Sequence, residues 1–157
     1  MKRIFVGSTI LLLILAAAPA VASAEDTNGL EGVWDAHITV SDCNGHFLRS
    51  VRSFDMYIHD GSVSAAGGTV AGTGLPLPRT NAVGSWQHLQ GRTFSAVFRF
   101  FGLNTDGALV TIATATRKLE LNGDTLTATD KLTVTDLNGV VLNTACSDVT
   151  ATRLATH

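Results

Sequence analysis

Two residues of opposite charge, each in a segment where apolar and polar residues alternate, are the side chains best able to do chemistry. Asp130 interrupts an otherwise apolar series, and two-residue turns on either side would place it opposite Ala115 and Ser147. Arg117 would then lie one diagonal step away. An acid inside a protein must be paired or neutral, so we expect an Arg117–Asp130 pair with Ser147. Such a pair would anchor or protonate a bound small molecule, or only fix strand register, unless a local twist exposes Asp130.

No other group of residues has a spacing with a defined chemistry. H-E-x-x-H and C-x-x-C are absent and the five His are scattered, so we expect no metal site. The absence of G-x-S-x-G, a P-loop, a dinucleotide-binding glycine pattern and paired carboxylates disfavours hydrolase, kinase and redox functions. A formal charge of −2 argues against a dedicated nucleic-acid binder. We therefore predict no catalytic residue, no metal ligand, no cofactor and no nucleic-acid partner.

The first 24 residues have the layout of a secretory signal peptide. Met1-Lys2-Arg3 is basic, an apolar run follows, and the small residues Ala22-Ser23-Ala24 precede Glu25. A membrane anchor is the alternative, but the apolar run is short for a span. Removal of residues 1–24 leaves nine basic and thirteen acidic residues, a formal charge of −4. We expect residues 25–157 to form one domain that is secreted or periplasmic and free of the membrane after cleavage.

After Gly29, apolar and polar residues alternate with the period of two that is typical of β-strands. Turn dipeptides separate the segments: Asn44-Gly45, Asp60-Gly61, Gln90-Gly91, Asp106-Gly107, Asn122-Gly123 and Asn138-Gly139. With the longer Gly- and Pro-rich connection 67–82 they join eight strands, expected at 32–42, 47–59, 62–66, 83–89, 93–103, 108–121, 124–137 and 140–154. We predict an all-β fold, an eight-stranded antiparallel up-and-down β-barrel, with a two-sheet sandwich as the alternative.

The two cysteines supply one argument for a closed barrel. In an exported chain they are expected to form a Cys43–Cys146 disulfide, with two free buried thiols as the alternative. Cys43 ends the first strand and Cys146 lies early in the last, so a bond between them makes these strands neighbours. Direct pairing of the cysteines would place Ile38 opposite Ala151, to within a residue or two because directly opposed cysteines strain a disulfide.

Turn geometry supplies a second, independent argument. A tight turn at 138–139 pairs Leu132 with Ala145, which turns the odd residues of the last strand inward. The disulfide pairing turns the same residues inward from the other side. The inward face stays open for 47–59, where the even residues are more apolar but a tight turn at 44–45 would put the odd residues inside.

Residues near the start and the end of the predicted domain resemble a known pattern. Gly32-Val33-Trp34 opens the first strand and Arg153 closes the last, and the predicted register puts Trp34 and Arg153 on one inner face. This combination resembles the calycin superfamily of lipocalin-like and avidin-like barrels, in which the Trp of a G-x-W motif packs beneath an Arg or Lys from the last strand. The chain is also similar to small exported bacterial barrel proteins of unassigned role. The resemblance implies a structural role for Trp34 and Arg153 at the closed end.

An eight-stranded barrel is wide enough either to be filled by its side chains or to hold one small ligand. The predicted interior has many alanines, which leave space, and larger groups that would contact a ligand: Trp34, Phe94, Phe98, Phe100, Arg117 and Asp130. We therefore predict a protein that binds a small apolar molecule without turnover. Two alternatives are a barrel-fold cyclase or isomerase resembling allene oxide cyclase in architecture, and a non-catalytic scaffold with a filled core.

Two surface features bear on access and on partners. The connection 67–82 would lie at the open end, where its tip Leu75-Pro76-Leu77-Pro78 is either a lid or an ordinary solvated crossover. Apolar residues predicted to face outward would form a patch suited to a homodimer: Val97, Phe101, Val110 and Ile112.

Overall fold

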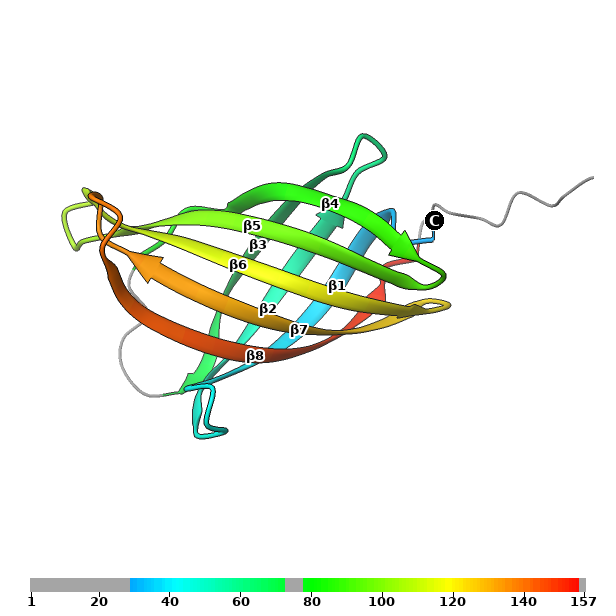
Figure 1. Ribbon diagram of the computed structural model, residues 1–157, viewed down its shortest axis with the longest axis horizontal. Coiled ribbons are helices and arrows are strands. Elements are labelled where there is room, and N and C mark those ends of the chain that lie inside the picture. The colour runs from blue at the N-terminus through cyan, green and yellow to red at the C-terminus, as the bar shows by residue number, and fades with distance from the viewer. Residues whose placement is uncertain (1–28, 73–77, 156–157) are drawn as a thin grey trace, which may run out of the picture.

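The chain forms a closed barrel of eight antiparallel strands, each paired with its neighbours in the sequence (Figure 1). The computed structural model describes residues 29–72 and 78–155. The strands are β1 Gly32–Ser41, β2 Phe47–Tyr57, β3 Ser62–Gly72, β4 Ala82–Gln90, β5 Thr93–Leu103, β6 Leu109–Asn122, β7 Thr125–Thr135 and β8 Val141–Arg153. The predicted all-β barrel is therefore confirmed. The predicted signal peptide, residues 1–24, lies outside the described residues.

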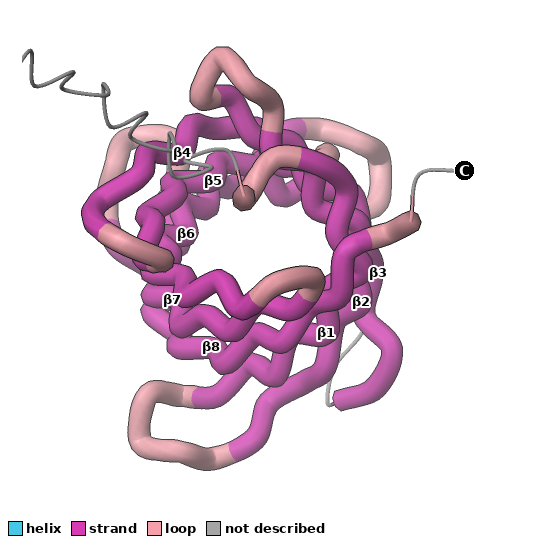
Figure 2. Tube along the Cα trace, turned by 90° about the vertical axis from the view of Figure 1, so that its right-hand side faces the viewer, coloured by secondary structure: helices cyan, strands magenta, loops and turns pink. Residues whose placement is uncertain are grey.

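Pairing of the first and last strands closes the barrel, and Figure 2 shows β1 between β2 and β8 in the ring of strands. Ile38 lies opposite Val149, whereas direct cysteine pairing predicted Ala151 as its partner. The observed register differs from direct cysteine pairing by two residues, within the residue or two that the prediction allowed. An even offset leaves side chains on the same face of the sheet, so the predicted inward faces of both strands are retained.

The disulfide explains this offset. Cys43 lies beyond the end of β1, in the β1–β2 turn, with a φ of 64°, and Cys146 pairs across the sheet with Ser41. The two cysteines are bonded, with their Cα atoms 4.8 Å apart. The predicted Cys43–Cys146 disulfide is confirmed, but it links a turn to a strand instead of two directly opposed strand residues.

The β6–β7 turn is centred one residue later than predicted. Asn122 pairs with Thr125, so Gly123 is the first of the two central residues, with a φ of 60° that suits glycine. Moving a turn by one residue moves the whole pairing by two. Arg117 therefore lies directly opposite Asp130, where a diagonal relation was predicted.

The β7–β8 pairing matches the prediction, with Leu132 opposite Ala145. The turn itself is longer than two residues, because the Asp136 amide donates to the Val140 carbonyl at 2.9 Å across it. A β-bulge next to the turn then shifts the register by one residue and restores the predicted pairing.

Strand β3 is longer than the predicted segment 62–66 and continues to Gly72. Its pairing with β4 is short, from Ser62 to Ala65 only, so the two strands separate towards the open end. The predicted long connection thus begins as a strand, and most of its proposed lid tip, residues 73–77, lies outside the described residues.

The inward face of β2 is the odd one. Ser53, Asp55 and Tyr57 are buried, whereas Phe54 and Met56 are exposed on the outer wall. The turn is longer than two residues, because the Asp42 amide donates to the His46 carbonyl, and a bulge between Val40 and Ser41 restores the register that a tight turn at 44–45 predicted. Strand β2 brings polar groups into the barrel.

Candidate functional site

A cluster of charged and polar side chains is buried inside the barrel; we call it the Arg117 cluster. Its members come from four strands and are each at most 9% exposed: Ser53, Asp55 and Tyr57 on β2, Arg117 on β6, Asp130 on β7 and Ser147 on β8. All occupy inward positions in the alternation of their strands. The cluster contains the pair that the sequence predicted and adds a second acid.

Arg117 stands at the centre of the cluster between two carboxylates. Its Nε donates to Asp130 Oδ1 at 2.6 Å and its Nη2 donates to Asp130 Oδ2 at 2.9 Å. Its Nη1 donates to Asp55 Oδ2 at 2.6 Å. The first two bonds form the parallel, bidentate contact that is the strong form of an arginine–carboxylate pair. One guanidinium thus binds two carboxylates from β2 and β7, strands that are not neighbours in the sheet.

Neutral side chains complete the shell around the ion pairs. Ser147 Oγ donates to Asp130 Oδ2 at 3.2 Å, and Ser53 Oγ donates to Asp55 Oδ1 at 2.6 Å. The ring of Phe98 lies under the guanidinium, with 4.7 Å from the Arg117 Cζ to the ring centre. Every buried side-chain nitrogen or oxygen in the described part of the chain has a hydrogen-bond partner. The cluster therefore does not depend on a ligand to satisfy its polar atoms.

Burial and charge act together on the titration of this cluster. Burial alone lowers the pKa of Arg117, but the Tyr57 oxygen and the carboxylates of Asp130 and Asp55 outweigh it and raise that pKa well above its ordinary value. Burial raises the pKa of Tyr57 to about 12, partly opposed by the charge of Arg117. Arg117 is therefore a permanent cation and Tyr57 a neutral phenol at physiological pH.

The sequence prediction missed the three cluster residues of β2, Ser53, Asp55 and Tyr57, of which Asp55 is the charged one. It falls among the odd residues of β2, which the turn at 44–45 favoured, but the more apolar even residues obscured that face. A signal was available: an acid on an inward face needs a cation, and Arg117 was predicted to stand inside the same barrel.

The cluster separates two parts of the interior that differ in burial. On the side of the cluster towards Trp34, the inward residues Leu119 of β6 and Leu126 of β7 are only 1% and 2% exposed. On the other side of the cluster, the inward residues Leu132 and Val134 are only half-buried, whereas the alanines opposite them, Ala145 and Ala113, are 5% and 3% exposed. We call the part on the Leu119 side, towards Trp34, the closed half. The part on the Leu132 side, towards the turns at 42–46, 104–108 and 136–140, is the open half.

The closed half is a packed core. Trp34 is fully buried, and its Nε1 donates to the Leu30 carbonyl at 2.9 Å. Arg153 covers the indole, with its Cζ 4.2 Å from the ring, and also donates to the carbonyls of Gly29 and Glu31. Large side chains and alanines fill the space above it. This arrangement seals one end of the barrel.

The open half keeps apolar surface in contact with solvent. Ile38, Phe100 and Ala115 pack against the core and yet are only half-buried, although all three stand at inward positions. An inward side chain of a closed barrel can meet water only through an opening. These residues, with Leu132 and Val134, are therefore partly exposed inside the open end of the barrel, and we call the region that they border the hollow.

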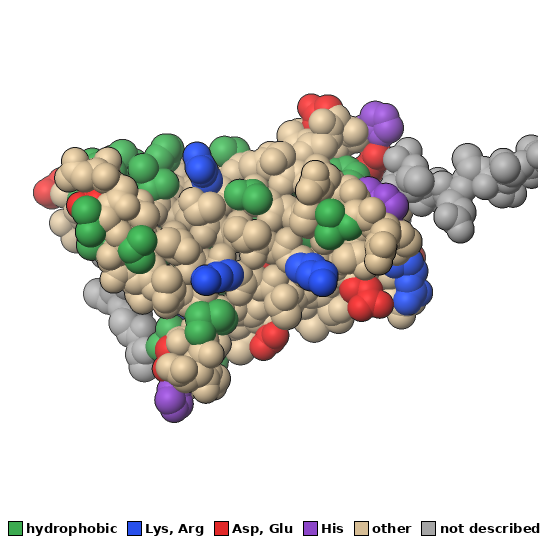
Figure 3. Space-filling model, viewed as in Figure 1, with side chains coloured by type: hydrophobic (Ala, Val, Ile, Leu, Met, Phe, Trp, Pro, Cys, Tyr) green, Lys and Arg blue, Asp and Glu red, His purple; other side chains and the backbone are tan. Residues whose placement is uncertain are grey.

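The rim of the open half is also apolar. Figure 3 shows apolar side chains gathered at its left end, over the β5–β6 and β7–β8 turns. The residues concerned are between 37% and 60% exposed: Leu109, Val110, Leu137, Val140, Val141 and Leu142. Val97 and Phe101 also face outward as predicted, at 38% and 43% exposure, whereas Ile112 is half-buried.

The six predicted ligand contacts lie in three places: the packed core, the Arg117 cluster and the open half. Trp34, Phe94 and Phe98 are at most 3% exposed and belong to the packed core. Arg117 and Asp130 are bonded to each other between the halves. Phe100 alone of the six borders the open hollow.

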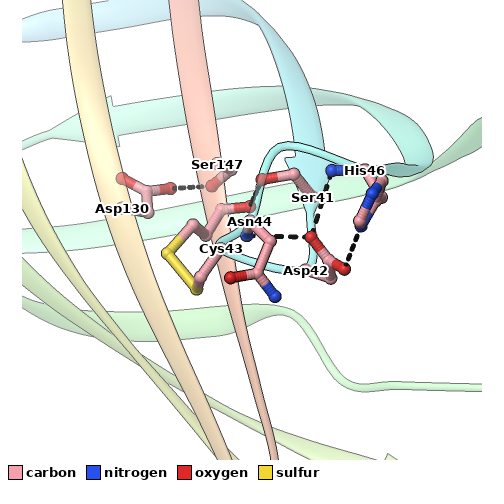
Figure 4. The surroundings of a disulfide bond; sticks show 8 residues. Ser41, Asp42, Cys43, Asn44, His46, Asp130 and Ser147 are labelled. Atoms are coloured by element: carbon pink, nitrogen blue, oxygen red, sulfur yellow. Dashed lines mark hydrogen bonds and ion pairs between the residues drawn. A yellow bond between two sulfur atoms is a disulfide. The ribbon is translucent and has the colours of Figure 1, made fainter.

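A second concavity lies on the outer wall next to the disulfide. It has a volume of about 640 Å³, and its lining includes the outward residues Lys118, Lys131 and Asp148. Three residues of the Arg117 cluster also border it: Arg117, Asp130 and Ser147. Figure 4 shows the nearby disulfide and, on neighbouring strands, the bond between Asp130 and Ser147. The concavity is open to solvent.

No group of three His, Cys, Asp or Glu side chains within 29–72 and 78–155 gathers where it could hold a metal ion. The same described residues contain no helix long and apolar enough to cross a membrane. Comparison with known proteins gives no match to a family model, a curated protein or a solved structure. The geometry of the two halves is therefore the basis for a functional conclusion.

Proposed function

We propose that this protein binds a small apolar molecule in the open half of its barrel and does not transform it. The observation that carries the proposal is the half-exposure of apolar side chains at inward positions, Ile38, Phe100 and Val134 among them. Water in contact with such a surface is released when an apolar ligand covers it, which favours binding.

The Arg117 cluster supplies the floor of this pocket. Its groups are bonded to each other, so a ligand above it meets a surface with no unsatisfied polar atom. Trp34 and Phe94 lie beyond that floor, whereas Phe98 stacks against Arg117 and stands opposite Ala115. Of the predicted contacts, we retain Phe100 as a wall residue, with Arg117 and Asp130 below it.

Catalysis by Asp130 would require a carboxylate free to exchange a proton with a substrate. Both of its oxygens are engaged by Arg117 at 2.6 and 2.9 Å, and Ser147 adds a further bond. The cyclase or isomerase alternative therefore has no free acid or base at this position, and binding without turnover is the simpler function.

We further propose that the protein works outside the cytoplasm as a calycin-like barrel. The Cys43–Cys146 disulfide is stable in an oxidising compartment, which suits the signal peptide predicted for residues 1–24. The contact between Trp34 and Arg153 has the form that the calycin resemblance implies. Self-association through the outward residues Val97 and Phe101 is a separate proposal, for which light scattering that shows a monomer at high concentration is the contrary result.

Binding can be tested with Nile red, a neutral apolar dye whose emission rises in an apolar site. We expect saturable binding by the wild type. Val134→Trp fills the hollow and should weaken binding at least about tenfold, because a tryptophan occupies the volume that the dye needs. Thr133→Trp is the matched control on the same strand and opposite face, and should bind as the wild type does. Equal binding by both variants would place the dye elsewhere and contradict the proposal.

A further inference from the structure

Two arginines outside the Arg117 cluster face the mouth of the open half. Arg49 stands at an inward position of β2, opposite the buried Val40. Arg79 forms a β-bridge with Gly102, which is the next inward position after Phe100 on β5. Both side chains are half-buried. The wall of the hollow thus carries two cations at its entrance.

The Arg79 guanidinium is held in a defined position. Its Cζ lies 4.9 Å from the centre of the Phe100 ring, and its Nη2 donates to the Gly67 carbonyl at 2.9 Å. That second bond crosses the region where β3 and β4 no longer pair. A guanidinium stacked on a ring keeps N–H groups at its edge for an acceptor in the hollow.

The positive charge at the mouth has no acidic ion-pair partner in the described part of the chain. Neither Arg49 nor Arg79 forms an ion pair with any described residue. Asp55, on the same face of β2 as Arg49, is bonded to Arg117 at 2.6 Å. Burial and then the charge of Arg49 lower the pKa of Arg79, with Asp55 opposing them, so the two arginines lie within electrostatic reach of each other. An anion placed between them would relieve this repulsion.

We propose that the ligand of the open half is an anionic amphiphile. Its apolar chain would lie along Phe100, Leu132 and Val134, and its carboxylate or phosphate headgroup would be bound by Arg49 and Arg79. Arginine suits such a headgroup because its planar donors match two oxygens of one oxyanion. This inference rests on the proposed function and adds the chemistry of the headgroup.

The test compares four probes with the same chain and different headgroups: dodecanol, dodecanoate, dodecyl phosphate and dodecylammonium, each below its micelle concentration. Displacement of Nile red reports binding. We expect dodecanoate or dodecyl phosphate to bind at least about tenfold more tightly than dodecanol, and dodecylammonium to bind least. The order of the two anions identifies the preferred headgroup, and either order supports the inference.

Three variants assign the effect to the mouth. Arg49→Gln and Arg79→Gln should each reduce anion affinity about tenfold while dodecanol binds as before. Arg99→Gln, on the outer face of β5, should leave all four affinities unchanged. Because Arg79 also bridges to Gly67, thermal unfolding of each variant confirms its fold, and Arg49→Gln provides a test that does not touch that bridge.

The outcomes separate the inference from the function on which it rests. If dodecanol displaces Nile red as well as dodecanoate does, or if the Arg49 and Arg79 variants keep full anion affinity, the headgroup site is wrong and apolar binding stands. If Nile red does not bind the wild type at all, the proposed function itself is wrong.

Discussion

The two halves of this barrel are built from the same strands but differ in how far their inward side chains are buried. In the closed half, inward residues such as Leu119 and Leu126 are no more than 2% exposed, and Trp34 is sealed by Arg153. In the open half, Leu132 and Val134 stand on the same face of the same strand as Leu126 and remain half-exposed. The inward side chains of one barrel are therefore covered towards one end and partly exposed towards the other.

The Arg117 cluster forms the boundary between them and also ties the wall together. Its ion pairs join β2 to β6 and β6 to β7, and Ser147 adds β8. Buried ion pairs give little net stability over an apolar replacement, but removal of one partner is costly. We interpret the cluster as a device that fixes strand register and closes the floor of the hollow.

The largest effect expected from breaking this boundary is that of Arg117→Met. It leaves Asp55 and Asp130 buried without a cation, and we expect a loss of about 3–5 kcal/mol in the free energy of unfolding at pH 7. Urea denaturation measures it.

Arg99→Met, on the outer wall, is the control and should change stability by less than about 0.5 kcal/mol. A similar small loss for Arg117→Met would mean that the cluster does not hold the wall together. The contrast between the halves would then have another origin.

A pair of leucine substitutions tests the contrast directly. Leu119→Ala in the closed half should reduce the free energy of unfolding by about 2–5 kcal/mol, because it creates a cavity in a packed core. Leu132→Ala in the open half should reduce it by less than about 1.5 kcal/mol, because that side chain already meets water. Equal losses in urea denaturation would show that the open half is as well packed as the closed half.

A smaller effect is expected at the seal of the closed end. Arg153→Gln removes the charge that lies over Trp34 and should cost about 1–2 kcal/mol in thermal unfolding. Arg153→Lys keeps a cation but not the planar contact and should fall in between. Unchanged Nile red binding by Arg153→Gln would show that the seal and the pocket are independent, whereas lost binding would place the ligand in the closed half.

The smallest effect lies at the β1–β2 turn on the open end. The His46 side chain and the amides of Asn44 and His46 lower the pKa of Asp42 to about 2, and Asp42 raises the pKa of His46. NMR titration should show both shifts, and Asp42→Asn should return His46 to its ordinary value.

The signs of these shifts fix the pH dependence of the turn. The His46 contribution is present below its unfolded pKa and is lost as the pH rises through the folded value. The Asp42 contribution is lost only as the pH falls towards about 2. Unshifted values for both residues would mean that the contact is absent in solution.

Most of the fold followed from the sequence because strand alternation and turn dipeptides are local signals. The turn residues set the number of strands, and the two cysteines joined the first strand to the last. Leu132 and Ala145 were paired correctly, although a longer turn and a bulge produced that register together. Offsets of two residues, as at Ile38, left every inward face unchanged.

The candidate site was less predictable because it depends on the exact register of the strands and on how deeply each inward side chain is buried. Arg117 and Asp130 were expected to meet, but their direct opposition required the turn to begin at Gly123. Asp55 was hidden because Phe54 and Met56 make the outer face of β2 the more apolar one. The alternation of apolar and polar residues indicates which side chains point inward. It does not indicate which of these are covered by residues of other strands.

The sequence by itself determined an eight-stranded barrel, its closure by Cys43 and Cys146, and the meeting of Arg117 with Asp130, because each follows from periodicity, turn chemistry or charge pairing along the chain. The tertiary structure alone decided that Asp55 joins them, that inward side chains are buried towards Trp34 and partly exposed at Leu132 and Val134, and that the Arg79 guanidinium lies against the Phe100 ring. These properties depend on distances between strands that are remote in sequence, and no local pattern encodes such distances.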